Sequence, residues 1–183
     1  MKKISLFTTL GVAAIFTMSA HSESTGIITF NGQITGTTCN VMVASQSNNA
    51  TITLPTVSSS QLTELGKVAG TTDFDMVLTD CSTAEDDMKT VSAYFEAGKQ
   101  VNTQTGRLNN QLTDGAGNVT LQLLDRENMQ PIKIGDASQN DGNTYAKIED
   151  GRAVLNYAVQ YHAEQAVTPG LVSSYVTYSL QYK

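Results

Sequence analysis

The chain of 183 residues has no tryptophan, only two histidines and two cysteines, and few charged residues. Two cysteines are too few for a tetrahedral zinc site made of cysteine ligands. Charged side chains make up 15% of the chain, and 17 acidic residues against 11 basic ones give a formal net charge of -6. A nucleic-acid-binding protein needs a basic surface. The composition therefore excludes a four-cysteine zinc site and predicts no nucleic-acid partner.

The N-terminus has the pattern of a secretory signal peptide. Lys2 and Lys3 precede a short, mostly apolar stretch over residues 6–18, and the small residues Ala20 and Ser22 follow. We expect cleavage after Ser22, with cleavage after Ala20 as the alternative. The apolar stretch is shorter than the ~20 residues that span a bilayer, which argues against a membrane anchor.

Cleavage after Ser22 leaves 183 - 22 = 161 residues and removes two lysines, so 9 basic residues face 17 acidic ones, a balance of -8. Because export leads to an oxidising compartment, we expect Cys39 and Cys81 to form a disulfide. A loop of this size should stabilise the fold by ~4 kcal/mol in the chain-entropy model. A redox role is not indicated, because no C-x-x-C motif is present.

Apolar residues alternate with polar ones in many short runs, each bounded by Gly, Asn, Asp, Ser or Pro. A period of two predicts strands with one buried face. We read the polar, Gly-rich residues 103–117 as a loop and allow one helical turn within residues 58–65. The pattern predicts an all-β antiparallel sandwich with strands at 27–34, 38–43, 50–54, 73–78, 91–95, 119–123, 132–134, 153–161 and 176–182.

Both ends of the mature chain are alternating apolar runs, at residues 27–34 and 176–182. Such a strand at a sheet edge is a pairing hazard that soluble proteins normally avoid. Two of them in one exported chain indicate that strand pairing at an edge is the function. The alternative is an ordinary sandwich whose first and last strands pair within the chain.

Other chemistry has little support in the sequence. His162 is the one histidine after the signal segment, no G-x-S-x-G motif accompanies it, and we expect a surface residue. The acidic run at residues 136–141 misses the calcium-loop spacing, because Asp141 stands where that loop needs Gly, so we expect a solvated turn. We predict no catalytic residue, no cofactor and no metal site.

The two ends of the mature chain carry specific motifs. Residues 26–32 read Gly-Ile-Ile-Thr-Phe-Asn-Gly, which fits a G-x-ϕ-x-F-x-G segment. At the other end, Tyr182 is penultimate, Gly170 is fourteenth from the end, and alternating apolar residues lie between them. With the signal segment and the cysteine spacing, these motifs make the chain resemble the fimbrial (type 1-like) major pilins of the bacterial chaperone–usher pathway, over essentially the whole mature chain.

The resemblance implies an incomplete immunoglobulin-like β-sandwich that lacks its last strand and is completed by donor-strand exchange. It divides the chain into a signal peptide (1–22), an N-terminal donor-strand extension (23–33) and a pilin domain (34–183). The donor residues are then Gly26, Ile28, Phe30 and Gly32. The C-terminal strand that borders the groove and binds the chaperone is then formed by Gly170, Val176, Tyr178, Leu180 and Tyr182.

The resemblance also implies partners and a location. The chain is expected to polymerise head to tail with other pilin subunits, after a periplasmic chaperone and an outer-membrane usher have handled it. The fimbria would stand on the cell surface, with a host receptor possible through the pilus. One departure concerns Ser24, a small polar residue where the family's outermost groove site receives the extension.

Three functions remain open at this point. The first is a structural subunit of the main pilus shaft. The second is a minor or tip-proximal pilin that binds a host ligand. The third is a self-contained exported β-sandwich, which would not polymerise.

Overall fold

The computed structural model describes residues 27–32, 34, 36, 38–82 and 89–183. The chain divides into two units, residues 1–33 and residues 34–183. The signal peptide, Ser24 and Gly26 lie outside the described residues. In the first unit, residues 27–32 form no strand, although a strand was predicted there. The reason is physical, since a strand exists only through backbone pairing with a partner.

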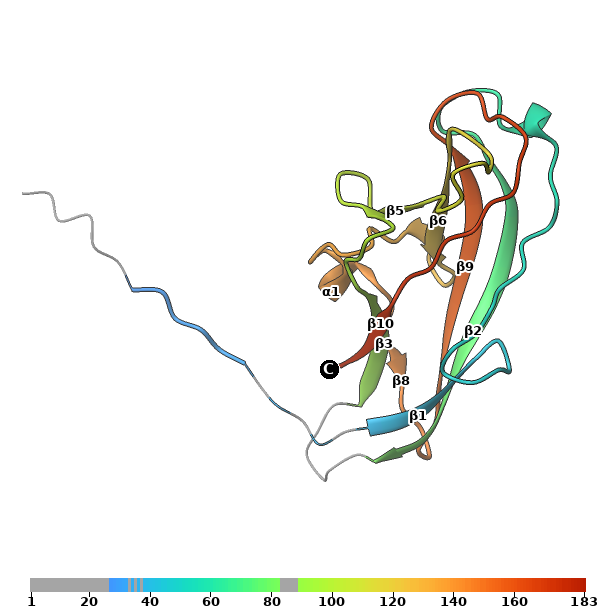
Figure 1. Cartoon of the computed structure of the whole chain (residues 1–183). Helices are drawn as coiled ribbons and strands as arrows, with labels where there is room; N and C mark the ends of the chain where they lie inside the picture. Colours follow the sequence, from blue (N-terminus) through green and yellow to red (C-terminus); the bar gives the residue numbers. More distant parts are fainter. Residues whose placement is uncertain (1–26, 33, 35, 37, 83–88) are drawn as a thin grey trace, which may run out of the picture. The chain divides into compact units, whose positions relative to one another are not determined.

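The second unit is a sandwich of two antiparallel sheets (Figure 1). Its larger sheet has the order β1-β2-β9-β6-β5-β4, with β7 paired to β6, and its smaller sheet has the order β10-β3-β8. The larger sheet contains β1 (Thr38–Val43), β2 (Val68–Ser82), β4 (Val101–Asn102), β5 (Arg107–Asn109), β6 (Val119–Asp125), β7 (Gln130–Pro131) and β9 (Ala153–Ala163). The smaller sheet contains β3 (Thr90–Phe95), β8 (Ala146–Lys147) and β10 (Tyr178–Tyr182).

The core lies between the two sheets and follows the period of two. On β9, Leu155 and Tyr157 point inward and are 3% and 2% exposed, while Val154, just before Leu155, is 44% exposed. Phe95 of β3 meets the Tyr157 ring edge to face, with 5.1 Å between ring centroids. Alternation places every second side chain on the same face, so the strands of both sheets supply one continuous apolar layer.

The predicted strands from residue 38 onward are largely confirmed, with differences at their ends. β2 is longer than the predicted run 73–78, because its pairing with β9 continues to Val68 opposite His162. The predicted loop 103–117 contains the three-residue strand β5. Residues 132–134 form no strand, although both isoleucines there are buried. Elements of two to four residues, such as β4, β8 and helix α1 (Gln139–Gly142), are too short to show a period.

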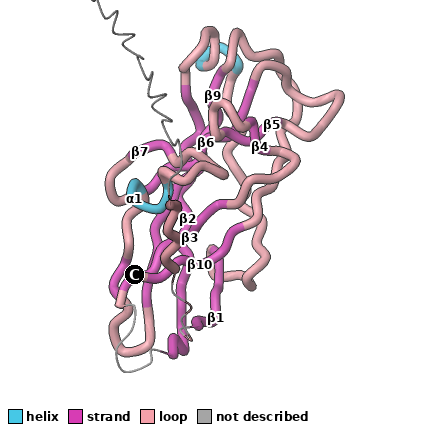
Figure 2. The backbone as a smooth tube through the Cα atoms, turned by 90° about the vertical axis from the view of Figure 1, so that its left-hand side faces the viewer, coloured by secondary structure: helices cyan, strands magenta, loops and turns pink. Residues whose placement is uncertain are grey.

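Two predicted strand segments have no strand partner in the described structure. Residues 50–54 form no strand, and the C-terminal strand begins at Tyr178 rather than at Val176. The turn of helix η1 (Ser59–Gln61) was predicted within residues 58–65. Figure 2 shows the long loop-coloured stretches that run beside the strands of the sandwich. These unpaired stretches border the site described next.

Candidate functional site

A groove of about 1600 Å³ runs along the sandwich between the two unpaired segments. Most of residues 47–57 line one side of it and residues 167–180 line the other, over a floor of apolar side chains from both sheets. The floor includes Phe74, Phe95, Leu121, Leu123 and Val159. None of the described residues that line the groove carries a charge. The groove therefore opens part of the hydrophobic core to the outside.

The side chains along both walls are only half-buried. Ile52 and Leu54 on one wall and Val172 and Val176 on the other pack against the core while part of each surface stays accessible. In an intact sandwich such alternating residues face a strand between them. The alternation along both walls is thus the pattern that borders one additional strand.

The backbone of β10 presents a free edge toward the groove. Lys183 and Thr90 of β3 exchange two N–H···O bonds of 2.9 Å, and the Glu96 amide donates to the Thr177 oxygen at 2.8 Å. Because antiparallel pairs alternate between bonded and non-bonded residues, the bonds from β10 to β3 come from Ser179 and Gln181. The peptide groups of Tyr178, Leu180 and Tyr182 point the other way and have no backbone partner among the described residues.

Four of the five predicted C-terminal site residues lie along the groove. Gly170, Val176, Tyr178 and Leu180 line the groove. Tyr182 is outside the lining and packs, half-buried, against the core. The Tyr178 hydroxyl donates to the Asn48 carbonyl at 2.9 Å and so joins β10 to the opposite wall. Burial raises the pKa of Tyr178, which keeps that hydroxyl protonated as a donor.

Gly170 lies where no side chain fits. A Cβ there would overlap the backbone of Gly115 and Ala116. The close approach is maintained by backbone bonds on both sides, Ala116 N–H to the Leu171 oxygen at 2.9 Å and Thr168 N–H to the Gly117 oxygen at 3.2 Å. Glycine at this position therefore lets the wall segment lie flat against the loop before β6.

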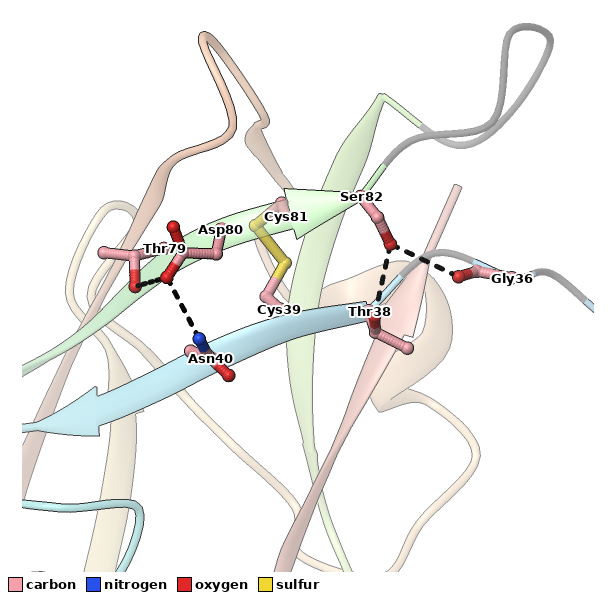
Figure 3. Close-up of a disulfide and its surroundings, with 8 residues drawn as sticks. All are labelled: Gly36, Thr38, Cys39, Asn40, Thr79, Asp80, Cys81 and Ser82. Carbon is pink, nitrogen blue, oxygen red and sulfur yellow. Dashed lines mark hydrogen bonds between the residues drawn. A yellow bond between two sulfur atoms is a disulfide. The ribbon is translucent and has the colours of Figure 1, made fainter.

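The predicted disulfide between Cys39 and Cys81 is confirmed, and it joins β1 to β2 (Figure 3). It lies at an irregularity in the pairing of the two strands, between Thr38 and Asn40. The hydroxyls of Thr38 and Ser82 are 3.2 Å apart on one side, and Asn40 donates to Asp80 at 3.0 Å on the other. Because Cys39 lines the groove, this cross-link fixes β1 beside it.

The predicted donor residues lie in the first unit. Ile28 is 79% exposed and Phe30 is 88% exposed, and Gly32 has open space around its Cα atom. Ile27, on the other face of an extended chain, is 96% exposed. The segment 27–32 is thus an apolar stretch whose side chains are still in contact with solvent.

His162 differs from its prediction as a surface residue. Its side chain is buried on the outer face of β9, with 3.4 Å between Nδ1 and the Glu164 carboxylate. Glu164 also accepts two bonds from the Arg107 guanidinium, at 2.7 and 3.0 Å. Burial and the Arg107 charge lower the pKa of His162. The cluster fastens β5 to β9, and its histidine was misplaced because a strand end gives no signal about what covers it.

The described residues contain no other candidate centre. Among them, no group of three or more His, Cys, Asp or Glu side chains is placed to hold a metal ion. In the same part of the chain, no helix has the length and apolar character needed to cross a membrane. The groove is therefore the site to compare with known proteins.

The chain matches the family model "Type-1 fimbrial protein, A" over residues 54–183. It is 38% identical over 184 residues to the F17 fimbrial protein of Escherichia coli, a match that covers 100% of both chains. It is 41% identical over 167 residues to the major fimbrial subunit SMF-1 of Stenotrophomonas maltophilia (strain K279a), with 89% of this chain and 95% of that protein covered.

Solved structures of pilus subunits share the fold. The P pilus rod subunit PapA superposes with a TM-score of 0.61 at 22% identity, covering 79% of this chain and 99% of that chain. A chain in the structure of a chaperone–usher pilus gives a TM-score of 0.60 at 23% identity, covering 88% and 97%. The sandwich is accordingly the incomplete immunoglobulin-like sandwich of such subunits. The family model and the two relatives show that this chain belongs to the type-1 fimbrial protein family and is a structural subunit of a fimbria at the cell surface.

Proposed function

We propose that the chain builds the pilus by donor-strand exchange, with residues 23–33 of one copy filling the groove of the next. A periplasmic chaperone lends a strand to the groove first, and the outer-membrane usher is where the incoming subunit replaces it. In this assembly Ile28 and Phe30 enter the groove, with Gly26 and Gly32 at its ends. Val176, Tyr178 and Leu180 line the accepting edge, and the terminal carboxylate of Lys183 is the anchor for the chaperone.

One observation carries this proposal: the groove and the N-terminal segment match in their chemistry. The groove is apolar and uncharged, and β10 presents free peptide groups along it. Residues 24–33 are also uncharged and carry two large apolar side chains on one face. Burying Ile28 and Phe30 would contribute roughly 1.5–3 kcal/mol each. An uncharged contact also suits a mature chain of net charge -8, whose copies repel each other.

The geometry of the contact favours a filament. The groove and the segment that fills it are different surfaces of the chain, so the contact is head to tail. Such a contact does not close on itself unless the rotation between copies forms a ring. Strand addition supplies backbone hydrogen bonds for affinity and alternate side chains for register. A main-shaft subunit is the role that uses both surfaces in every copy.

The test is gel electrophoresis of sheared surface material in SDS, unheated and heated in parallel. A strand buried along the groove should dissociate slowly, so the unheated sample should contain high-mass species that collapse to one monomer band on heating. Deleting residues 23–32 should abolish these species while the protein still binds its chaperone. A single monomer band from unheated, correctly exported protein would contradict the proposal and favour a self-contained sandwich.

Two point variants sharpen the test, because Ile27 and Ile28 are adjacent and differ in the face they occupy. Phe30→Ser and Ile28→Ser remove apolar contacts from the face that enters the groove, and we expect both to lose the heat-sensitive multimers. Ile27→Ser, the matched control, changes an isoleucine that is also exposed but lies on the other face, and it should retain them. If Ile27→Ser and Ile28→Ser gave the same amount of heat-sensitive multimers, the prediction that Ile28 and not Ile27 enters the groove would be wrong.

A further inference from the structure

The smaller sheet has a second edge, on the side of β3 that faces away from β10. There β8 pairs with β3 only at Thr90 and Val91. Beyond that point the backbone groups of Ala93 and Phe95 point outward, because the neighbouring residues Ser92 and Tyr94 bond to β10. A bare edge of this kind would accept a strand as readily as the edge along the groove.

Side chains occupy this second edge in place of a strand. The Gln139 amide accepts from the Phe95 N–H at 2.9 Å and donates to the Phe95 oxygen at 3.0 Å. This pair of bonds is the one that an opposing residue makes in an antiparallel ladder, since a primary amide presents C=O and N–H side by side. Gln139 is 2% exposed, although it lies in a short turn of mostly polar residues.

The next peptide groups along the edge are closed in the same way. Asn143 donates to the Ala93 oxygen at 3.1 Å, and the Tyr157 hydroxyl accepts from the Ala93 N–H at 3.0 Å. Asn143 is 8% exposed and Tyr157 is 2% exposed. All four outward backbone groups of Ala93 and Phe95 are thus paired with buried side chains.

The turn that carries Gln139 and Asn143 is fixed to the domain at both ends. Before it, the Gly135 N–H donates to the Phe95 oxygen at 2.9 Å. Gly135 has a φ of +75°, and a Cβ at this position would collide with Ala97. After it, the Thr144 N–H donates to the buried Asp125 carboxylate at 2.6 Å. The two amide side chains are therefore held in register with β3.

We propose that Gln139 and Asn143 are specificity-determining residues for strand addition, because they close the second edge of the smaller sheet and leave the groove as the one edge that accepts a strand. This inference rests on the proposed function, since it concerns where the strand of a second copy can add. Without the two amides, residues 23–33 of another copy could pair with β3 at Ala93 and Phe95. Such pairing would compete with head-to-tail assembly and branch or aggregate the chains.

The test uses the mature chain, residues 23–183, with a synthetic peptide of residues 23–33, and native mass spectrometry counts the peptides bound per chain. Gln139→Met combined with Asn143→Leu keeps side-chain size and removes the amides. The matched control is Gln160→Met, because Gln160 is also buried but its amide bonds only to side chains of the larger sheet, Gln122 and Thr71. We expect the double variant to bind one more peptide than the wild type and the control to bind the same number.

Hydrogen exchange separates an edge effect from a folding defect. In the wild type with an empty groove, the Ala93 and Phe95 amides should exchange at least roughly tenfold more slowly than those of Tyr178 and Leu180. Equal exchange at the two edges would overturn the proposal even if the double variant failed to fold. A double variant whose Ala93 and Phe95 amides exchange fast but which binds no extra peptide would also overturn it. If the wild type bound no peptide while the double variant bound one, donor-strand exchange would be contradicted. The closed edge would still be supported, because the variant would have gained a site.

Discussion

The two edges of the smaller sheet have the same backbone chemistry, but the backbone groups are unpaired at one edge and paired at the other. Along β10, the peptide groups of Tyr178 and Leu180 face an apolar groove and have no backbone partner among the described residues. Along β3, the corresponding groups of Ala93 and Phe95 are paired with Gln139, Asn143 and Tyr157. The difference lies in side chains that come from distant parts of the chain. An edge is thus open or closed according to what the tertiary structure brings to it, rather than by its own sequence.

The comparison also explains how an incomplete sandwich can avoid unwanted strand pairing at a second edge. A fold with one missing strand exposes apolar core residues, which makes any second opening costly. Here the second edge is closed by hydrogen bonds from three buried side chains, two of them amides, without adding another strand. The described structure thus has one edge without a backbone partner, along β10, and one whose Ala93 and Phe95 groups are paired.

The largest expected effect concerns the disulfide beside the groove. Replacing both Cys39 and Cys81 by serine removes the cross-link between β1 and β2, and should lower the free energy of unfolding by roughly 4 kcal/mol for a loop of this size. Urea unfolding of the oxidised wild type and the variant measures the difference. Peptide binding in the groove should weaken too, because Cys39 lines it, while exchange at Ala93 stays slow. A variant as stable as the wild type would contradict the assigned role of the disulfide.

A smaller effect is expected from Gly170→Ala in the wall formed by residues 167–180. The new Cβ overlaps the backbone of Gly115 and Ala116, so the wall segment must move, at a cost of up to about 3 kcal/mol. Gly98→Ala is the control, because nothing lies within 4 Å of a Cβ there. We expect Gly170→Ala, and not the control, to reduce the affinity for the peptide of residues 23–33, measured by calorimetry. Equal affinities for the two variants would show that the close approach is not needed.

Tyr157→Phe tests the closed edge directly. It removes the hydroxyl that accepts from the Ala93 N–H and leaves a buried donor unpaired, which should cost about 2 kcal/mol. Tyr178→Phe is the counterpart at the open edge, where a half-buried hydroxyl bonds the Asn48 carbonyl, and about 1 kcal/mol or less is expected. Urea unfolding measures both values. A larger loss for Tyr178→Phe would reverse the assignment of the better protected edge.

The smallest effect concerns acid, at the turn before Gln139. Hydrogen bonds from Ser138, aided by the Lys133 ammonium, lower the pKa of Asp136 from 3.8 to about 2. A carboxyl whose folded pKa lies below its unfolded value stabilises the fold above the unfolded pKa. That contribution should be lost as the pH falls from about 3.8 towards about 2. Phe95 exchange, corrected for intrinsic rates, should rise in this window, and Asp136→Asn should remove the rise. An unchanged pH profile in Asp136→Asn would exclude Asp136 as its source.

The strands that were predicted well share long runs with a period of two. β1 has the predicted bounds, and β3, β6 and β9 contain their predicted runs. The segment 50–54 has the same pattern but forms no strand, because pairing needs a neighbour that the described chain does not supply. At the site, Val176, Tyr178 and Leu180 were found from their alternation and from the family motif, and Gly170 from its distance to the C-terminus. Gln139 was missed, because a glutamine in a polar turn reads as solvated.

Local pattern is enough for the fold class, for the pairing of the cysteines and for the presence of a C-terminal strand. These properties depend on the period of apolar residues, on export and on spacing, all of which can be read along the chain. The volume of the groove, the burial of His162 and the closure of the β3 edge depend on residues that lie far apart in sequence. Tyr157 and Ala93 are 64 residues apart and Gln139 and Phe95 are 44 apart, so their hydrogen bonds exist only once both sheets have packed.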